Sequence, residues 1–79
     1  MGKTLTIYPT AEYKELAIHS GDYINSIKIM DLRGTTLYNA AQKPARENTI
    51  DITHFPTATY IVEVSFDDNR KGRSLFVKE

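Results

Sequence analysis

The chain has 79 residues and no cysteine, and its ten basic and ten acidic side chains cancel to a formal net charge of zero. A chain of this length forms one small domain that buries only about 60% of its unfolded surface, and no disulfide can stabilise it. The balanced charge removes the electrostatic attraction toward nucleic acid or an anionic lipid surface. No run reaches the roughly 18 apolar residues that a membrane-spanning helix needs, and no signal-peptide pattern is present.

The first residues, Met1-Gly2, resemble a start added in cloning. We therefore assign Met1–Lys3 to that start and residues 4–79 to a single domain. We expect the domain to be a fragment of a longer protein, whose own targeting signal would lie outside this sequence.

Apolar and polar residues alternate with a period of two, and turn residues interrupt them at close intervals. This pattern is typical of short antiparallel strands. The turn cluster at 20–22 is expected to end a strand, and residues 40–47, which include Pro44, are expected to form a loop. In chain order the predicted strands are 4–8, 15–19, 23–31, 35–38, 49–53, 60–66 and 73–77. About seven short strands without a helical period predict an all-β, immunoglobulin-like antiparallel sandwich.

Two connections have the composition of tight turns. Asp31–Gly34 is expected to close a hairpin, because an Asp side chain can accept from backbone N–H groups two residues on and Gly suits the last position. The polar segment 67–72 is expected to form a second hairpin tip, with left-handed backbone at Asn69 and Gly72.

Tyr60 begins the strongest predicted strand and follows Phe55-Pro56-Thr57-Ala58-Thr59. In immunoglobulin-like sandwiches a Tyr at this corner donates a hydrogen bond to upstream backbone while its ring packs in the core. We predict this tyrosine corner at Tyr60. A plain core tyrosine is the alternative.

The sequence offers little for catalysis or for a cofactor. His19 and His54 lie apart and have no cysteine beside them, whereas a zinc site needs three or four converging ligands. Asp67-Asp68 could supply oxygens to a calcium ion, but Arg70 and Lys71 follow directly, so a solvated hairpin tip is the preferred interpretation. Most of the aromatic residues are assigned to the core and not to a stacking platform. We therefore predict no enzyme activity, no metal and no cofactor.

Five segments occur in the order found in one known family: Leu5–Pro9, Ile27–Gly34, Ile50–Thr53, Phe55–Val62 and Phe76–Glu79. Together they resemble the type A C-terminal sorting domain of the type IX (Por) secretion system of Bacteroidetes. The resemblance covers nearly the whole chain. The residues taken as its structural motif are Tyr8, Pro9, Asp31, Gly34, Pro56 and Tyr60.

The resemblance implies a signal at the C-terminus of a cargo protein, which passes through the periplasm and crosses the outer membrane to the cell surface or medium. Its implied partners are the outer-membrane translocon, a sortase and the N-terminal cargo domains; nucleic acid and membrane insertion are not implied. The chain departs from the family pattern at Thr10-Ala11, at Thr35 after the Asp31–Gly34 turn and at Ala58, which marks a divergent member. Removal by the sortase and retention of the domain both stay open.

We expect recognition to involve the last strand, at Phe76, Val77, Lys78 and Glu79, because an edge strand offers unpaired backbone groups. The alternative function is a fibronectin-type structural or adhesive module of a surface protein, since one fold hosts many roles. The sequence leaves open whether two copies pair into a dimer and what the parent protein does.

Overall fold

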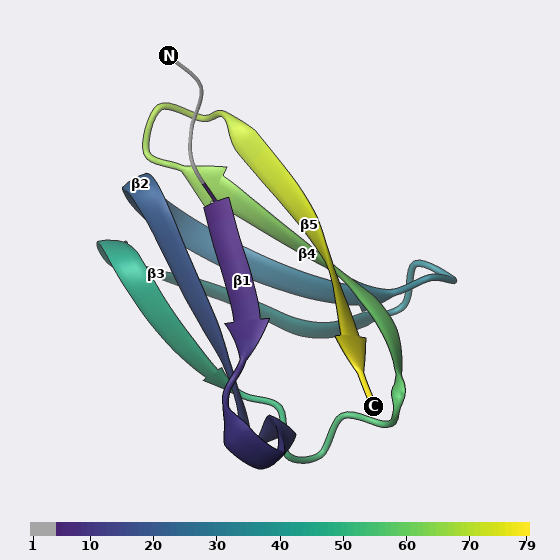
Figure 1. Cartoon of the computed structure of the whole chain (residues 1–79). Helices are drawn as coiled ribbons and strands as arrows, with labels where there is room; N and C mark the ends of the chain where they lie inside the picture. Colours follow the sequence, from purple (N-terminus) through teal and green to yellow (C-terminus); the bar gives the residue numbers. More distant parts are fainter. Residues whose placement is uncertain (1–4) are drawn as a thin grey trace.

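A computed structural model describes residues 5–79, apart from the side chains of Ala11, Gln42 and Lys43. The predicted start Met1–Lys3 and the first residue of the first predicted strand, Thr4, lie outside the described residues. The elements in chain order are β1 (Leu5–Pro9), a one-turn 3-10 helix η1 (Ala11–Tyr13), β2 (Glu15–Asp31), β3 (Thr36–Asp51), β4 (Ala58–Phe66) and β5 (Lys71–Lys78) (Figure 1).

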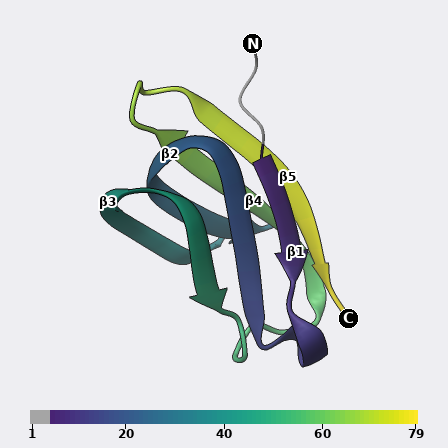
Figure 2. The same cartoon turned by 60° about the vertical axis from the view of Figure 1, so that its left-hand side comes forward.

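Two long strands, β2 and β3, bend and contribute to both layers of a β-sandwich (Figure 2). The first half of β2 pairs with β1 and with the second half of β3. The second half of β2 pairs with the first half of β3 and with β4, which in turn pairs with β5. All of these pairings are antiparallel, so the predicted all-β antiparallel sandwich is confirmed.

The seven predicted strands appear as five longer ones, because two predicted interruptions are absent. Residues 20–22 lie inside β2, where the pairing register with β3 shifts between His19 and Ile24 and Gly21 allows the bend. Residues 40–47, predicted as a loop, belong to β3. Pro44 is tolerated there because β3 pairs only with β2, so the missing N–H can lie on the open edge.

The core lies between the layers and is built from the inward positions of alternating strands. Along β4 every second side chain is buried, which gives this strand an inner and an outer face. The buried cluster consists of Leu16, Ile18, Ile24, Ile27, Ile29, Ile50, Ile52, Tyr60, Val62, Val64, Phe66 and Phe76.

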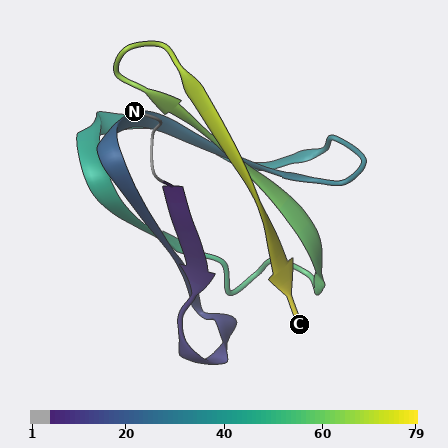
Figure 3. The ribbon, with the colours of Figure 1, turned by 45° about the horizontal axis from the view of Figure 1, so that its top comes forward.

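The two hairpin turns differ in why they need glycine. Gly34 has a φ of +92° and closes the turn between β2 and β3, which projects from the side of the sandwich (Figure 3). In the β4–β5 turn, Asn69 takes the predicted left-handed conformation with a φ of 70°, but Gly72 is not left-handed. Gly72 instead provides space, since a Cβ there would lie 3.2 Å from the Phe66 ring and 3.4 Å from the Leu5 side chain.

β1 and β5 lie side by side and run in the same direction (Figures 1 and 2). Among residues 5–79 no strand pairing joins them, so both are edge strands. No helix in this part of the chain is long and apolar enough to cross a membrane.

Candidate functional site

The last strand presents two different faces to its surroundings. Phe76 points inward and is 4% exposed, whereas its neighbours Leu75 and Val77 point outward and are 66% and 54% exposed. This alternation follows from the pleat of the strand. Of the residues predicted for recognition, Val77 is therefore available to a partner and Phe76 belongs to the core.

Lys78 fastens the end of β5 to the connection between β3 and β4. Its ammonium donates hydrogen bonds to three backbone carbonyls, those of Ile52 at 2.7 Å, Thr53 at 3.2 Å and Phe55 at 2.7 Å. An ammonium has three N–H donors, and here all three are used inside the domain. Lys78 is thus a structural residue whose partners come from a distant part of the sequence.

Glu79 is also held by the domain. Its Oε2 accepts a hydrogen bond of 3.1 Å from the hydroxyl of Tyr13, and this bond raises the pKa of the Tyr13 hydroxyl. Tyr13 and Glu12 lie in η1 with left-handed φ values of 54° and 63°. Such backbone is strained for residues other than glycine, so the surrounding contacts must maintain it.

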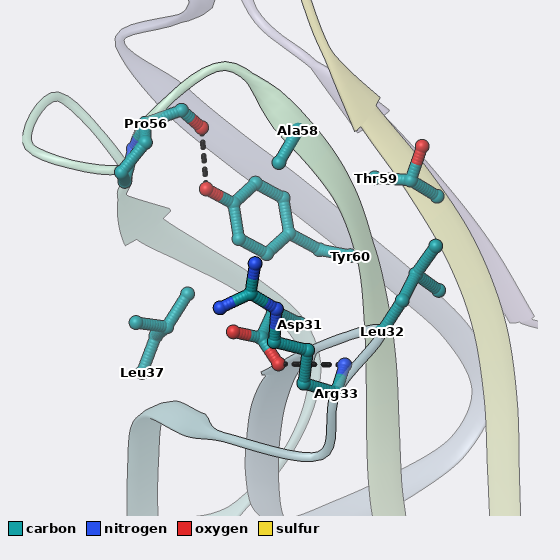
Figure 4. A pocket seen from close by; sticks show the side chains of 8 residues that line it. All are labelled: Asp31, Leu32, Arg33, Leu37, Pro56, Ala58, Thr59 and Tyr60. Atoms are coloured by element: carbon teal, nitrogen blue, oxygen red, sulfur yellow. Dashed lines mark hydrogen bonds between the residues drawn. The ribbon is translucent and has the colours of Figure 1, made fainter.

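Tyr60 forms the predicted tyrosine corner at the start of β4. Its ring is 1% exposed, and its hydroxyl donates to the carbonyl of Pro56 (Figure 4). Burial, followed by the negative charge of Asp31, raises the pKa of Tyr60. Ala58 is not among the residues with positive φ.

A shallow groove of about 310 Å³ opens beside this corner. Tyr60 is among its lining residues, and Leu32 and Arg33 of the β2–β3 turn line it as well (Figure 4). Asp31 shapes that turn, because its Oδ1 accepts from the backbone N–H groups of Arg33 and Thr35, both at 2.9 Å. The residues lining the groove are Asp31, Leu32, Arg33, Leu37, Pro56, Ala58, Thr59 and Tyr60.

The structure brings only part of the predicted motif together. Asp31, Pro56 and Tyr60 line the groove, and Gly34 closes the turn beside it. Tyr8 and Pro9 lie on β1 and are not groove residues. The Tyr8 ring stacks on His19 at 5.6 Å between centroids, and its hydroxyl lies 3.1 Å from Nε2 of that histidine.

The outer face of β4 and β5 was not among the predicted sites. Directly opposite residues of paired strands share a face. On this outer face Thr59 pairs with Val77, Ile61 with Leu75, and Glu63 with Arg73. The signal was available in the sequence, since these residues occupy the positions between the core residues.

Glu63 is the acidic centre of that outer face. Nε of Arg73 donates to its Oε2 at 2.8 Å, and this bond holds the pKa of Glu63 below its ordinary value. The positive charges of Arg73, Lys71 and Lys28 lower this pKa further. These three cations therefore surround a single carboxylate.

The described residues contain no cluster of three or more histidine, cysteine, aspartate or glutamate side chains suited to a metal ion. His19 lies on β2 and His54 in the connection after β3. Asp67 and Asp68 are exposed at the β4–β5 hairpin tip, and Asp68 pairs with Arg70 at 3.4 Å.

Residues 6–78 match the family described as the secretion system C-terminal sorting domain. The chain belongs to this family of type IX secretion signals. Membership implies a parent cargo protein, an interaction with the secretion machinery, and export across the outer membrane to the surface or medium.

Solved structures show the same architecture. An immunoglobulin-like β-sandwich of the DUF3244 family from Bacteroides vulgatus superimposes with a TM-score of 0.78 at 22% identity, covering 95% of this chain and 83% of that one. CopC from Methylosinus trichosporium OB3b gives a TM-score of 0.55 at 21% identity, covering 96% and 85%. At these identities the likeness shows the fold alone. No curated protein matches the chain.

Proposed function

We propose that this domain is a non-catalytic sorting signal that folds in the periplasm and is then recognised by the outer-membrane translocon of the type IX system. A sortase then removes it from the exported cargo. The proposal rests on how β5 is exposed along its outer face and held at its end. This edge strand exposes Leu75 and Val77 while its end is fastened to the sandwich through Lys78.

A sorting signal needs a surface that keeps its shape, because flexible groups lose conformational entropy when they bind. The contacts of Lys78 and Glu79 supply that rigidity at the end of β5. Phe76 adds to it by packing its ring against Tyr60, with 6.0 Å between the centroids. The predicted recognition residues thus divide between one that is presented, Val77, and three that hold it in place.

The non-catalytic part of the proposal rests on the arrangement of titratable groups. Nucleophilic and acid–base catalysis require side chains that converge within hydrogen-bonding distance. His19 does meet Tyr8 and Glu47, at 3.1 Å and 3.6 Å, but in a cross-strand surface cluster in which the His19 and Glu47 side chains are 40% and 79% exposed. Asp51 accepts from the neighbouring Thr53, which is a turn contact.

Removal by a sortase is compatible with the way β1 is held. Leu5 pairs with Ser20, and the ladder continues to Pro9 opposite Leu16. A cut ahead of Leu5 would therefore leave every described pairing of the sandwich intact.

The test is to fuse the whole chain to the C-terminus of a periplasm-directed fluorescent reporter in a bacterium that has the type IX system. We expect the reporter at the surface or in the medium, and in the periplasm once the translocon is deleted. A reporter that stays in the periplasm of both strains contradicts sorting and leaves the adhesive-module alternative. An exported product lacking about the 9.0 kDa of this chain shows removal, and one of full mass refutes the sortase step.

A further inference from the structure

The exposed large hydrophobic side chains fall into three groups, of which one, Leu32 and Leu37 at 66% and 42% exposed, lines the groove at the β2–β3 turn. Tyr8 and Tyr23, 46% and 45% exposed, each have a polar neighbour over the ring. His19 stacks on Tyr8, and the guanidinium of Arg46 lies 5.2 Å from the centre of the Tyr23 ring. Leu75 and Val77 are aliphatic and more exposed, and such side chains gain most from burial against a partner.

Leu75 and Val77 belong to a larger apolar surface on the outer face of the sheet. Ile61 of β4 pairs with Leu75 on one side and with Met30 of β2 on the other. These three side chains form one row across three strands, and Thr59 and Val77 form the next. We call this surface, made of Met30, Thr59, Ile61, Leu75 and Val77, the outer patch.

A basic border adjoins the outer patch on the same face. The row next to Met30, Ile61 and Leu75 consists of Lys28, Glu63 and Arg73, and Lys71 follows on β5. Glu63 forms an ion pair with Arg73, with 2.8 Å between Oε2 of Glu63 and Nε of Arg73. Lys28 and Lys71 consequently remain in excess, although the whole chain is neutral.

We propose that the outer patch and its basic border dock onto a protein component of the secretion machinery whose surface is apolar and flanked by carboxylates. This inference rests on the proposed sorting function and specifies the partner's chemistry. Complementary charge speeds encounter and selects among partners, while buried aliphatic side chains supply most of the affinity. A second copy of this chain fits less well, since its outer face would bring the same excess of cations.

The experiment uses the reporter fusion with two pairs of variants. The patch variant carries Leu75→Thr and Val77→Thr, and its control is Tyr23→Thr at an exposed hydrophobic residue outside the patch. The border variant carries Lys28→Glu and Lys71→Glu, and its control carries Lys14→Glu and Arg46→Glu at exposed cations elsewhere. Export is expected to fall about tenfold or more in the patch and border variants and to change less than about twofold in the controls.

Urea unfolding of the purified domains accompanies the assay, and a photo-crosslinking amino acid at position 75 or 23 of the otherwise native chain provides a readout that needs no destabilising change. We expect position 75, but not 23, to crosslink to a type IX component, and the border variant to weaken this adduct. An adduct of twice the domain mass overturns the proposal in favour of a dimer. Normal export of both folded variants also overturns it, whereas failure of the unmodified fusion to leave the periplasm refutes the sorting function itself.

Discussion

The inner and outer faces of β4 and β5 are built from the same two strands but differ in exposure. On the inner face, Tyr60, Phe66 and Phe76 are at most 4% exposed, while on the outer face Leu75 and Val77 are more than half exposed. The two sets alternate residue by residue, so a register slip of one position would exchange them. The comparison teaches that fold stability and the proposed docking surface can be changed separately by mutating adjacent residues.

Phe76 and Val77 are adjacent on β5 and show the largest expected difference in stability between the two faces. Phe76→Ala removes a buried ring from a small core and is expected to lower the free energy of unfolding by about 3–5 kcal/mol. That is close to the roughly 3–5 kcal/mol such a core supplies, so the variant should be largely unfolded. Val77→Ala should cost less than about 0.5 kcal/mol. Urea titration followed by circular dichroism measures both, and equal losses would contradict the division into two faces.

Tyr60→Phe tests the inner face at the corner. The substitution keeps the ring but deprives the Pro56 carbonyl of its donor, and we expect a loss of about 1–3 kcal/mol. Tyr8→Phe is the matched control, because it removes a hydroxyl from an exposed ring beside His19 and should cost about 0.5 kcal/mol or less. Unfolding midpoints of the two variants decide the matter; a similar shift in both would mean that the corner hydrogen bond adds little.

The Lys78→Met variant tests whether the hydrogen bonds of the Lys78 ammonium hold the end of β5 in place. The side chain keeps its length but leaves three carbonyls without their donor, and a loss of about 1–2 kcal/mol is expected. Lys71→Met, at the exposed other end of the same strand, is the control. Hydrogen exchange should quicken at the end of β5 and in residues 52–55 of the Lys78 variant only. Unchanged protection there would show that the end of β5 is fixed by other contacts.

The smallest effect concerns Glu63 on the outer face. Because Arg73 holds the pKa of Glu63 below its ordinary value of 4.5, the unfolded chain binds this proton more readily than the folded one. The contribution of Glu63 is therefore present above about pH 4.5 and is lost as the pH falls through the folded-state pKa. Glu63→Gln should flatten part of the stability loss between about pH 5 and pH 3, measured by urea midpoints. The rest of this pH-dependent stability loss should persist in the Glu63→Gln variant, because hydrogen bonds from Thr53 lower the pKa of Asp51 as well.

The alternation of the sequence predicts most of the fold, because each buried position contributes to the same core. It does not predict that β2 continues through 20–22 or that β3 continues through 40–47. Turn-favouring residues such as Gly21 also serve where a strand bends between layers, and Pro44 lies on an edge strand that needs no N–H at that position. Local signals cannot distinguish a bend from a turn, because the difference depends on which strands pair.

The candidate site was predictable only in part for the same reason. The tyrosine corner depends on residues close in sequence, and Tyr60 was assigned correctly. The carbonyls that hold Lys78 come from residues 52–55, and only the folded chain brings them together. Gly72 was assigned to left-handed backbone, whereas its actual constraint is the close approach of Phe66 and Leu5.

Because β1 and β5 run in the same direction, the start of β1 and the end of β5 lie at opposite ends of the domain. Leu5, at the start of β1, lies beside Gly72 near the start of β5, so both strands finish at the other end of the molecule (Figure 1). A polypeptide joined ahead of Leu5 would leave the domain near Lys71 of the basic border, whereas Val77 of the outer patch lies at the other end of a body whose longest dimension is 33 Å. The attached polypeptide would then lie beside the proposed basic border and leave the apolar end of the outer patch accessible.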